Sequence, residues 1–143
     1  MTNIKQVSQN FSSAGQISVQ DLEQASQAGF KSVLNLRSPD EEGFVNDEPK
    51  QAKASGLDYA NVPISSKEAN PQVIEQVIQE IENLPQPILV HCAGGGRATA
   101  IALIATATNE GWNNEQIKAK AQELNLKLEH PYLQQFLQDK AAI

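Results

Sequence analysis

The sequence predicts an α/β fold in which a central, mostly parallel sheet is flanked by helices. Short apolar runs typical of buried strands alternate along the chain with segments whose apolar residues recur at helical spacing. Glycine, proline and capping residues separate these segments. The chain has 143 residues, of which 40% are hydrophobic and 20% charged, so it is long enough to bury one core. We therefore expect a single domain over residues 1–143.

In the first half of the chain, we expect strands at residues 4–7, 11–14, 31–36 and 57–62 and helices at residues 18–28 and 50–55. The first helix begins at Ser18, whose side chain can cap it together with Asp21. Gly29 ends this helix. Residues 38–49 are acidic and rich in turn-forming residues, which indicates a loop or a broken helix.

In the second half, a helix begins at Pro71 after the capping residue Asn70, and prolines end it. The apolar run 88–90 is the expected central strand. Residues 98–108 are small and apolar on most faces, which predicts a buried helix on the sheet. Two further helices are expected at residues 113–124 and 131–140. Repeated strand–helix units place a site at the carboxyl ends of the strands.

One segment, residues 91–99, joins the central strand to the buried helix and carries the most chemistry. It contains Cys92, the only cysteine of the chain, followed by three glycines and Arg97. Backbone N–H groups of such a turn can bind an oxyanion, and the same partial positive charge favours a nucleophilic thiolate. An arginine adds a planar fork of donors that suits phosphate or sulfate. The segment therefore predicts an anion-binding loop around a thiol.

At these residues the chain resembles the cysteine-dependent protein phosphatases, the tyrosine and dual-specificity enzymes, whose loop begins His-Cys-x-x-Gly. It is similar in more detail to a narrower bacterial family, the phosphatase-like domain that is also found fused to beta-lactamase-like hydrolases. The segments that fit this family are residues 7–16, 28–37, 56–59 and 62–63. The resemblance covers residues 5–110 and implies a phosphatase-like fold.

The loop differs in length from that of the phosphatases. Phosphatases have five residues between cysteine and arginine, whereas four intervene in this chain: Ala93, Gly94, Gly95 and Gly96. Four residues match the beta-lactamase-hydrolase-associated family and also resemble the loop of rhodanese sulfurtransferases. Both patterns usually place Ser or Thr directly after the arginine, where this chain has Ala98.

Three functions from different classes follow from this resemblance. In a phosphatase, Cys92 attacks phosphorus, the backbone amides of residues 93–97 and the Arg97 guanidinium hold the oxygens, and water cleaves the cysteinyl-phosphate. In a rhodanese-like sulfurtransferase, Cys92 carries a persulfide. In a non-catalytic module, the loop only binds an anion. We expect the phosphatase, with a phosphorylated or other oxyanion substrate.

A phosphatase of this kind also uses a general acid to protonate the leaving group. The loop at residues 63–70, where the resemblance implies an aspartate, has Glu68 as its only carboxylate. Asp40, Glu41 and Glu42 lie on another strand-end loop. These three either reach the same pocket or form an acidic surface.

Other polar residues near the loop have two interpretations each. His91 either orders the turn, as the resemblance implies, or bonds to the backbone at the strand end. Thr99 either hydrogen-bonds to the thiolate or lines its helix. His130 is predicted to begin a helix, far from the loop in sequence.

Composition limits the partners and the location. A net charge of −6 argues against nucleic acid and anionic membrane surfaces as partners. A single cysteine excludes an internal disulfide and fits a reducing cytoplasm, and the N-terminus lacks the apolar core of a signal peptide. Two histidines and one cysteine form no visible metal-ligand pattern, so we expect neither a metal nor a cofactor.

Overall fold

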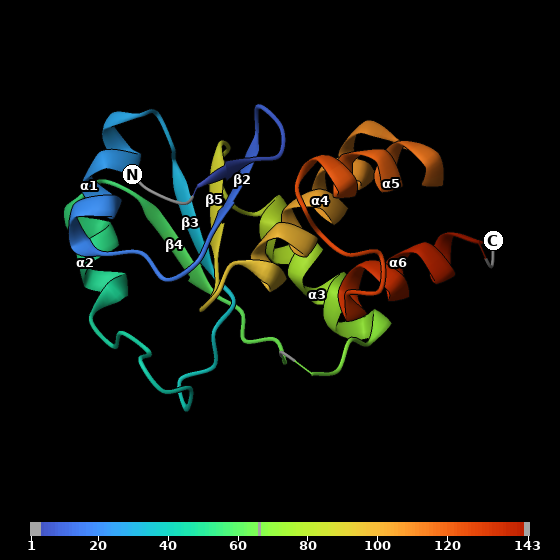
Figure 1. Ribbon diagram of the computed structural model, residues 1–143. Helices are drawn as coiled ribbons and strands as arrows, with labels where there is room; N and C mark the ends of the chain where they lie inside the picture. The colour runs from blue at the N-terminus through green and yellow to red at the C-terminus, as the bar shows by residue number, and fades with distance from the viewer. Residues whose placement is uncertain (1–3, 66, 142–143) are drawn as a thin grey trace.

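The computed structural model describes residues 4–65 and 67–141, and within them it confirms the predicted α/β fold (Figure 1). The strands are β1 (Lys5–Gln6), β2 (Phe11–Ala14), β3 (Ser32–Asn35), β4 (Asp58–Asn61) and β5 (Ile88–His91). The helices are α1 (Val19–Gln27), α2 (Glu48–Ala54), α3 (Pro71–Glu82), α4 (Gly96–Glu110), α5 (Asn114–Glu123) and α6 (Pro131–Ala141).

The strands form one sheet in the order β1-β2-β5-β3-β4. Strand β1 is antiparallel to β2, and the other neighbours are parallel. Strand β5 is central, with His91 in register with Ala14 on β2 and Asn35 on β3. The carboxyl ends of these three strands therefore meet at one edge of the sheet, and Cys92 follows directly after it.

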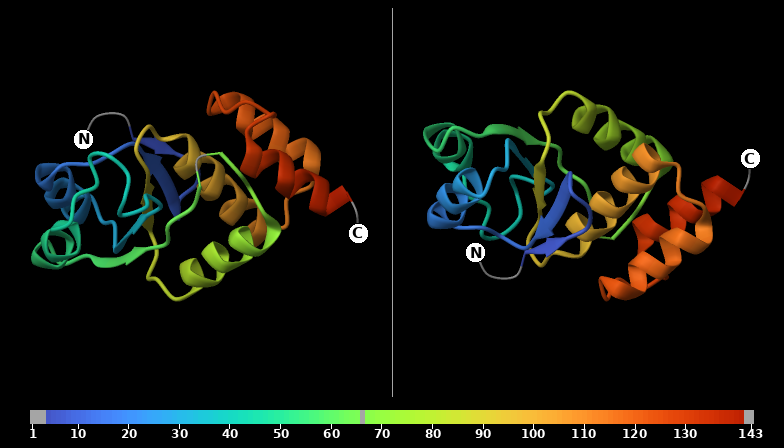
Figure 2. Two further views of the ribbon diagram at one scale, coloured as in Figure 1. Left: turned by 90° about the horizontal axis from the view of Figure 1, so that it is seen from below. Right: turned by 90° about the horizontal axis from the view of Figure 1, so that it is seen from above.

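Helices α1 and α2 cover one face of the sheet, and α3 to α6 lie on the other (Figures 1 and 2). Val33 and Leu89 belong to the smaller core under α1 and α2. Val90 and Cys92 belong to the larger core around α4. Because successive side chains of a strand point to opposite faces, His91 points toward the α1–α2 side, as Leu89 does. This alternation separates His91 from the thiol that follows it in sequence.

Two helices begin earlier than the sequence predicts. Helix α4 starts at Gly96 instead of residue 98, because Gly95 precedes it with φ +102°, a left-handed conformation that glycine adopts without strain. Arg97 is consequently part of the first helical turn and not of the loop. Helix α2 starts at Glu48, inside the segment expected to be a loop or broken helix, and Pro49 fits its first turn.

The remaining expectations hold to within a few residues. Ser18 and Asp21 form the predicted capping box of α1, and Asn70 caps α3. Helix α4 is buried along most of its length, as its small apolar residues predict. No helix within the described residues is long and apolar enough to cross a membrane.

Candidate active site

Cys92 lies in a cradle of backbone N–H groups at the start of α4. Its side chain is buried, and its Sγ accepts hydrogen bonds from the N–H of Gly95 at 3.1 Å and of Ala98 at 3.4 Å. Both donors belong to the helix N-terminus, where the macrodipole adds positive potential. These contacts stabilise a negative charge on the sulfur.

The segment after β2, Gly15 and Gln16, contacts the backbone of the loop that follows Cys92. The N–H of Gln16 donates to the carbonyl oxygen of Ala93 at 3.0 Å. A Cβ added at Gly15 would lie 2.9 Å from that same oxygen, closer than real Cβ atoms approach. A glycine at position 15 is therefore required by the close approach of the two backbones.

Arg97 is held by Glu41, a residue on the acidic loop after β3. The Nη1 and Nη2 groups of Arg97 donate to the two carboxylate oxygens of Glu41 at 2.9 and 3.0 Å, and Nη1 also donates to the carbonyl of Ile64 at 3.0 Å. The hydrogen bonds from Arg97 lower the pKa of Glu41 from 4.5 to about 2. The same contact, together with negative charge on Cys92, raises the pKa of Arg97. The pair is thus ionised at neutral pH.

The Arg97–Glu41 pair uses one of the two edges of the guanidinium. A guanidinium has two edges with parallel donors, an end-on edge and a side-on edge. Glu41 occupies the end-on edge of Arg97. Within the described part of the chain, the side-on edge, formed by Nε–H and one Nη2–H, is not used by a protein acceptor. Arg97 therefore has two parallel donors on that edge that pair with no acceptor among the described residues.

Arg37 gives the acidic loop its shape. Its Nε donates to Glu41 at 3.2 Å, and its Nη groups donate to the carbonyls of Gly43 and Glu42. Of the three consecutive carboxylates on this loop, Glu41 reaches Arg97, whereas the side chains of Asp40 and Glu42 are exposed. The loop following β3 is thus part of the site.

Behind the loop, His91 forms a buried hydrogen bond with Glu48 of α2. The His91 Nε2 lies 2.6 Å from Glu48 Oε2, and its Nδ1 lies 3.3 Å from the carbonyl oxygen of Cys92. Glu48 also accepts hydrogen bonds from Tyr59 Oη at 2.9 Å and Gln16 Nε2 at 2.8 Å. Burial alone raises the pKa of Glu48, but these hydrogen bonds and the charge of His91 lower it below its ordinary value. His91 therefore bonds to the backbone and to a carboxylate that sequence analysis did not find.

Thr99 lines its helix. Its hydroxyl donates to the carbonyl of Gly95 at 2.8 Å and accepts from the hydroxyl of Ser13 at 2.8 Å. Among the described residues its hydrogen bonds go to these groups and not to Cys92, so the second interpretation of Thr99 is the one observed. The contact ties β2 to the first turns of α4.

The loop that carries Glu68 is anchored by Tyr132 of α6. The Tyr132 hydroxyl lies 2.7 Å from the carbonyl of Ser65 and 3.1 Å from that of Glu68. The side chain of Glu68 is exposed, and its N–H donates to Ser65 Oγ at 3.2 Å. A role for Glu68 as general acid stays a prediction.

His130 lies beside the loop despite its distance in sequence. Its Nε2 would be 3.5 Å from a Cβ built on Gly96, and burial lowers its pKa. His130 directly precedes α6, as its sequence context predicts. The local sequence carries no signal for the contact with Gly96, because the fold brings α6 to the loop.

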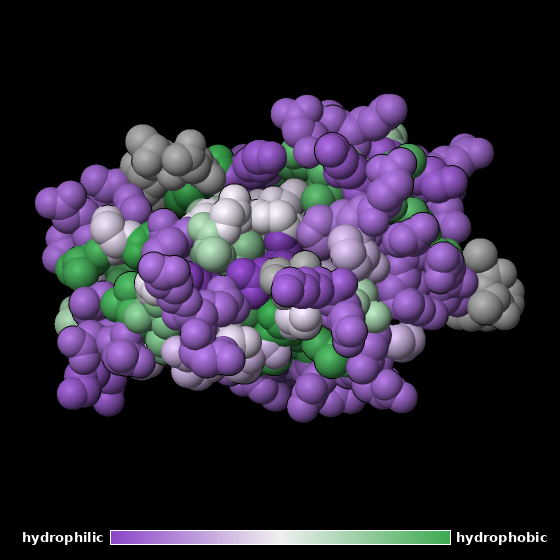
Figure 3. Space-filling model, turned by 60° about the horizontal axis from the view of Figure 1, so that its bottom comes forward, coloured by the Kyte–Doolittle hydropathy of each residue, from purple (hydrophilic) through white to green (hydrophobic). Residues whose placement is uncertain are grey.

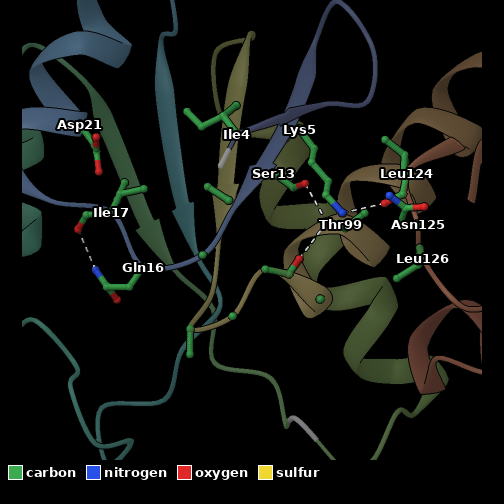
Figure 4. Close-up of a pocket in the computed structure, with 16 residues that line it drawn as sticks. Ile4, Lys5, Ser13, Gln16, Ile17, Asp21, Thr99, Leu124, Asn125 and Leu126 are labelled. Carbon is green, nitrogen blue, oxygen red and sulfur yellow. Dashed lines mark hydrogen bonds between the residues drawn. The ribbon is translucent and has the colours of Figure 1, made fainter. Parts of the chain in front are cut away.

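A pocket of about 540 Å³ adjoins the outer side of the loop (Figure 4). Its wall includes Lys5, Gln16, residues 93–96, Thr99 and Asn125, but not Cys92. Figure 3 shows the neighbouring lower face, which is mostly hydrophilic with scattered apolar patches. Among the described residues no three His, Cys, Asp or Glu side chains cluster as a metal-ligand set.

Comparison with known sequences identifies the family. The profile of the phosphatase-like domain of beta-lactamase hydrolase-like protein matches residues 3–109. A beta-lactamase hydrolase-like protein of Agrobacterium fabrum is 32% identical over 107 residues, which are 71% of this chain and 24% of that protein. The corresponding protein of Xylella fastidiosa is 27% identical over 122 residues, 81% of this chain and 28% of that protein. The chain thus spans about a quarter of the length of these curated relatives.

Solved structures share the fold. A candidate phosphatase from Shewanella putrefaciens CN-32 has a TM-score of 0.80 at 23% identity, covering 97% of this chain and 91% of its own. Tk-PTP in its active form has a TM-score of 0.78 at 16% identity, covering 96% and 95%. The core catalytic domain of the PP-IP phosphatase SIW14 from S. cerevisiae, solved with citrate, has a TM-score of 0.73 at 19% identity, covering 95% and 83%. With this protein tyrosine phosphatase-like fold and the match over residues 3–109, the chain belongs to the family of phosphatase-like domains of beta-lactamase hydrolase-like proteins.

Proposed function

We propose that the domain is a cysteine-dependent phosphatase that hydrolyses phosphate monoesters through a cysteinyl-phosphate. The observation that carries this proposal is the arrangement at the start of α4. The Cys92 sulfur accepts two backbone N–H groups there, and Arg97 of the same turn keeps its side-on edge for an oxyanion. A phosphate ester seated over the thiolate meets donors on several of its oxygens.

The reaction has two steps. The Cys92 thiolate attacks phosphorus, so that the S–P bond forms while the bond to the ester oxygen breaks, and the leaving alcohol or phenol takes up a proton. Backbone amides of residues 93–97 and the Arg97 guanidinium hold the other phosphate oxygens as charge develops on them. Water then attacks phosphorus, which releases inorganic phosphate and restores the thiolate.

The carboxylates around the site are poorly suited to protonate the leaving group. Glu41 is bound to Arg97 with a pKa of about 2, so it holds no proton to give at neutral pH. Glu48 is ionised and buried behind the loop, and Glu68 is exposed. We therefore expect the enzyme to depend on the intrinsic acidity of the leaving group.

Aryl phosphates are the substrate class that this limitation favours, because a phenolate needs little protonation. TpbA of P. aeruginosa, which has a TM-score of 0.65 and 14% identity to this chain, was solved with pTyr as a cysteine-to-serine variant. Its ligand supports an aryl phosphate as the first substrate to test.

The test compares an activated aryl phosphate with an alkyl phosphate such as phosphoserine. We expect aryl phosphate to be hydrolysed and the alkyl ester to be slower by about 10²–10⁴-fold, the usual cost of lacking an acid. Cys92→Ser should abolish phosphate release, and Glu68→Gln should lower the rate only if Glu68 is the acid.

A sulfurtransferase is the second candidate, because the four residues between Cys92 and Arg97 also fit a rhodanese-like loop. The same protein is therefore assayed with thiosulfate and cyanide. Thiosulfate turnover that requires Cys92, without phosphate release from any ester, would replace the phosphatase by the sulfurtransferase. Turnover of neither substrate, with anions still bound at the loop, would favour a binding module.

A further inference from the structure

We infer that Glu48 is a positioning residue for the nucleophile: its carboxylate keeps His91 as an imidazolium directly behind Cys92. The catalytic role of the thiolate rests on the proposed function, whereas the pairing of Glu48 with His91 does not. Glu48 and His91 are both buried, with side chains 1% and 0% exposed, in the layer between α2 and the end of β5.

Each ring nitrogen of His91 faces an oxygen atom. Nδ1 faces the carbonyl oxygen of Cys92 at 3.3 Å, and a carbonyl can only accept. Nε2 faces Glu48 Oε2 at 2.6 Å. Glu48 already accepts from Tyr59 Oη and Gln16 Nε2, which marks it as an ionised carboxylate that needs donors. The doubly protonated imidazolium satisfies both contacts at once.

The surroundings of His91 leave Glu48 as its counter-ion. The neighbours in register on β2 and β3, Ala14 and Asn35, carry no charge. Tyr59 is kept neutral, since burial and the adjacent carboxylate raise its pKa. The Cys92 side chain points to the opposite face of the strand, so the imidazolium acts on a Cys92 thiolate across the backbone, from the Cys92 carbonyl that Nδ1 faces and through its charge in the buried interior.

The same carboxylate also links the two ends of the anion loop. Gln16 donates its amide N–H to Glu48 and accepts from Arg37 Nη1 at 2.7 Å. Arg37 in turn holds Glu41, which holds Arg97. A continuous chain of hydrogen bonds thus runs from His91, before the nucleophile, to the arginine after it. Within this chain of hydrogen bonds, Glu48 carries the negative charge that faces His91.

The first experiment measures alkylation of Cys92, the only cysteine, by iodoacetamide at pH 6 and pH 10. Glu48→Gln should slow the reaction about 10-fold at pH 6, because the neutral amide no longer holds the imidazolium. The rate at pH 10 should stay unchanged, because that pH lies above the ordinary pKa of a free thiol, about 8.5. Glu48→Asp, which retains the charge, should recover part of the rate at pH 6.

Asp47→Asn is the matched control. Asp47 is adjacent in sequence and carries the same charge, but it is exposed and makes no side-chain cap bond. We expect no change in the alkylation rate at either pH. An equal slowing in Asp47→Asn and Glu48→Gln, or no slowing in Glu48→Gln, would overturn the inference.

A second measurement uses the unmodified protein and remains decisive if Glu48→Gln does not fold. Nitrogen-15 NMR at pH 7, with His130→Asn to assign the two histidines, should show both ring nitrogens of His91 protonated. A single protonated nitrogen would overturn the inference. Neither readout uses a phosphate ester, so an inactive protein with an intact imidazolium would refute the proposed function alone.

Discussion

Replacing Glu41 by glutamine tests the ion pair that orients Arg97. The pKa of Glu41 falls from 4.5 to about 2 in the folded protein, chiefly through its hydrogen bonds to Arg97. At about 1.4 kcal/mol per tenfold change, and with the carboxylate a quarter exposed, this corresponds to about 2–3 kcal/mol of folding free energy at pH 7.

The sign of the pH dependence follows from the direction of this shift. A carboxyl with a lower pKa in the folded state contributes its full stability above about pH 4.5 and loses it as the pH falls toward 2. The difference in unfolding free energy between wild type and Glu41→Gln should therefore be largest at pH 7 and below about 1 kcal/mol at pH 2.5.

Urea unfolding at a series of pH values measures this difference directly. Glu42→Gln is the matched control, because its side chain is exposed and only its backbone carbonyl bonds to Arg37. We expect Glu42→Gln to follow wild type throughout. If the gap between wild type and Glu41→Gln stays constant from pH 7 to pH 2.5, the ion pair does not supply the stability assigned to it.

Two further predictions concern the backbone around the loop. Gly15→Ala should lower stability by about 1–3 kcal/mol and reduce phosphate release, because the new Cβ would meet the Ala93 oxygen at 2.9 Å. Gly94→Ala, whose Cβ enters open space, is the control in the same unfolding assay, and an equal loss of stability would contradict the argument. Tyr132→Phe should lower stability by about 1 kcal/mol and speed amide hydrogen exchange at residues 65, 67 and 68, whereas unchanged exchange there would show that the hydroxyl does not anchor that loop.

The order of strands and helices was predictable from sequence because each element carries its own local signal. Ser18 and Asp21 mark a helix start by capping chemistry. The continuous apolar run of β5 indicates a strand buried on both faces, and Leu89 and Val90 do lie in the two different cores. Such signals depend only on near neighbours in the chain.

The loop from Cys92 to Arg97 could be located in the sequence for the same reason, whereas the residues that support it could not. Cys92, the glycines and Arg97 lie within one short segment. Glu48, in an acidic stretch before a proline, has the sequence pattern of a solvated residue. Its burial arises because α2 packs over the end of β5, and β5 turns His91 toward it. A contact between residues 43 positions apart leaves no trace in local composition.

Burial of α4 explains why the last third of the chain takes part in the site. Helix α4 is apolar around most of its surface, so the sheet can cover only one side of it. Ile117 of α5 and Leu133 of α6 cover another side, and both lie beyond residues 3–109, which the family profile matches. Once α6 packs there, its first turn falls beside the start of α4. This packing brings His130 to Gly96 and Tyr132 to the loop at residues 65–68. The need to bury one apolar helix thereby adds two polar side chains to the edge of the loop around Cys92.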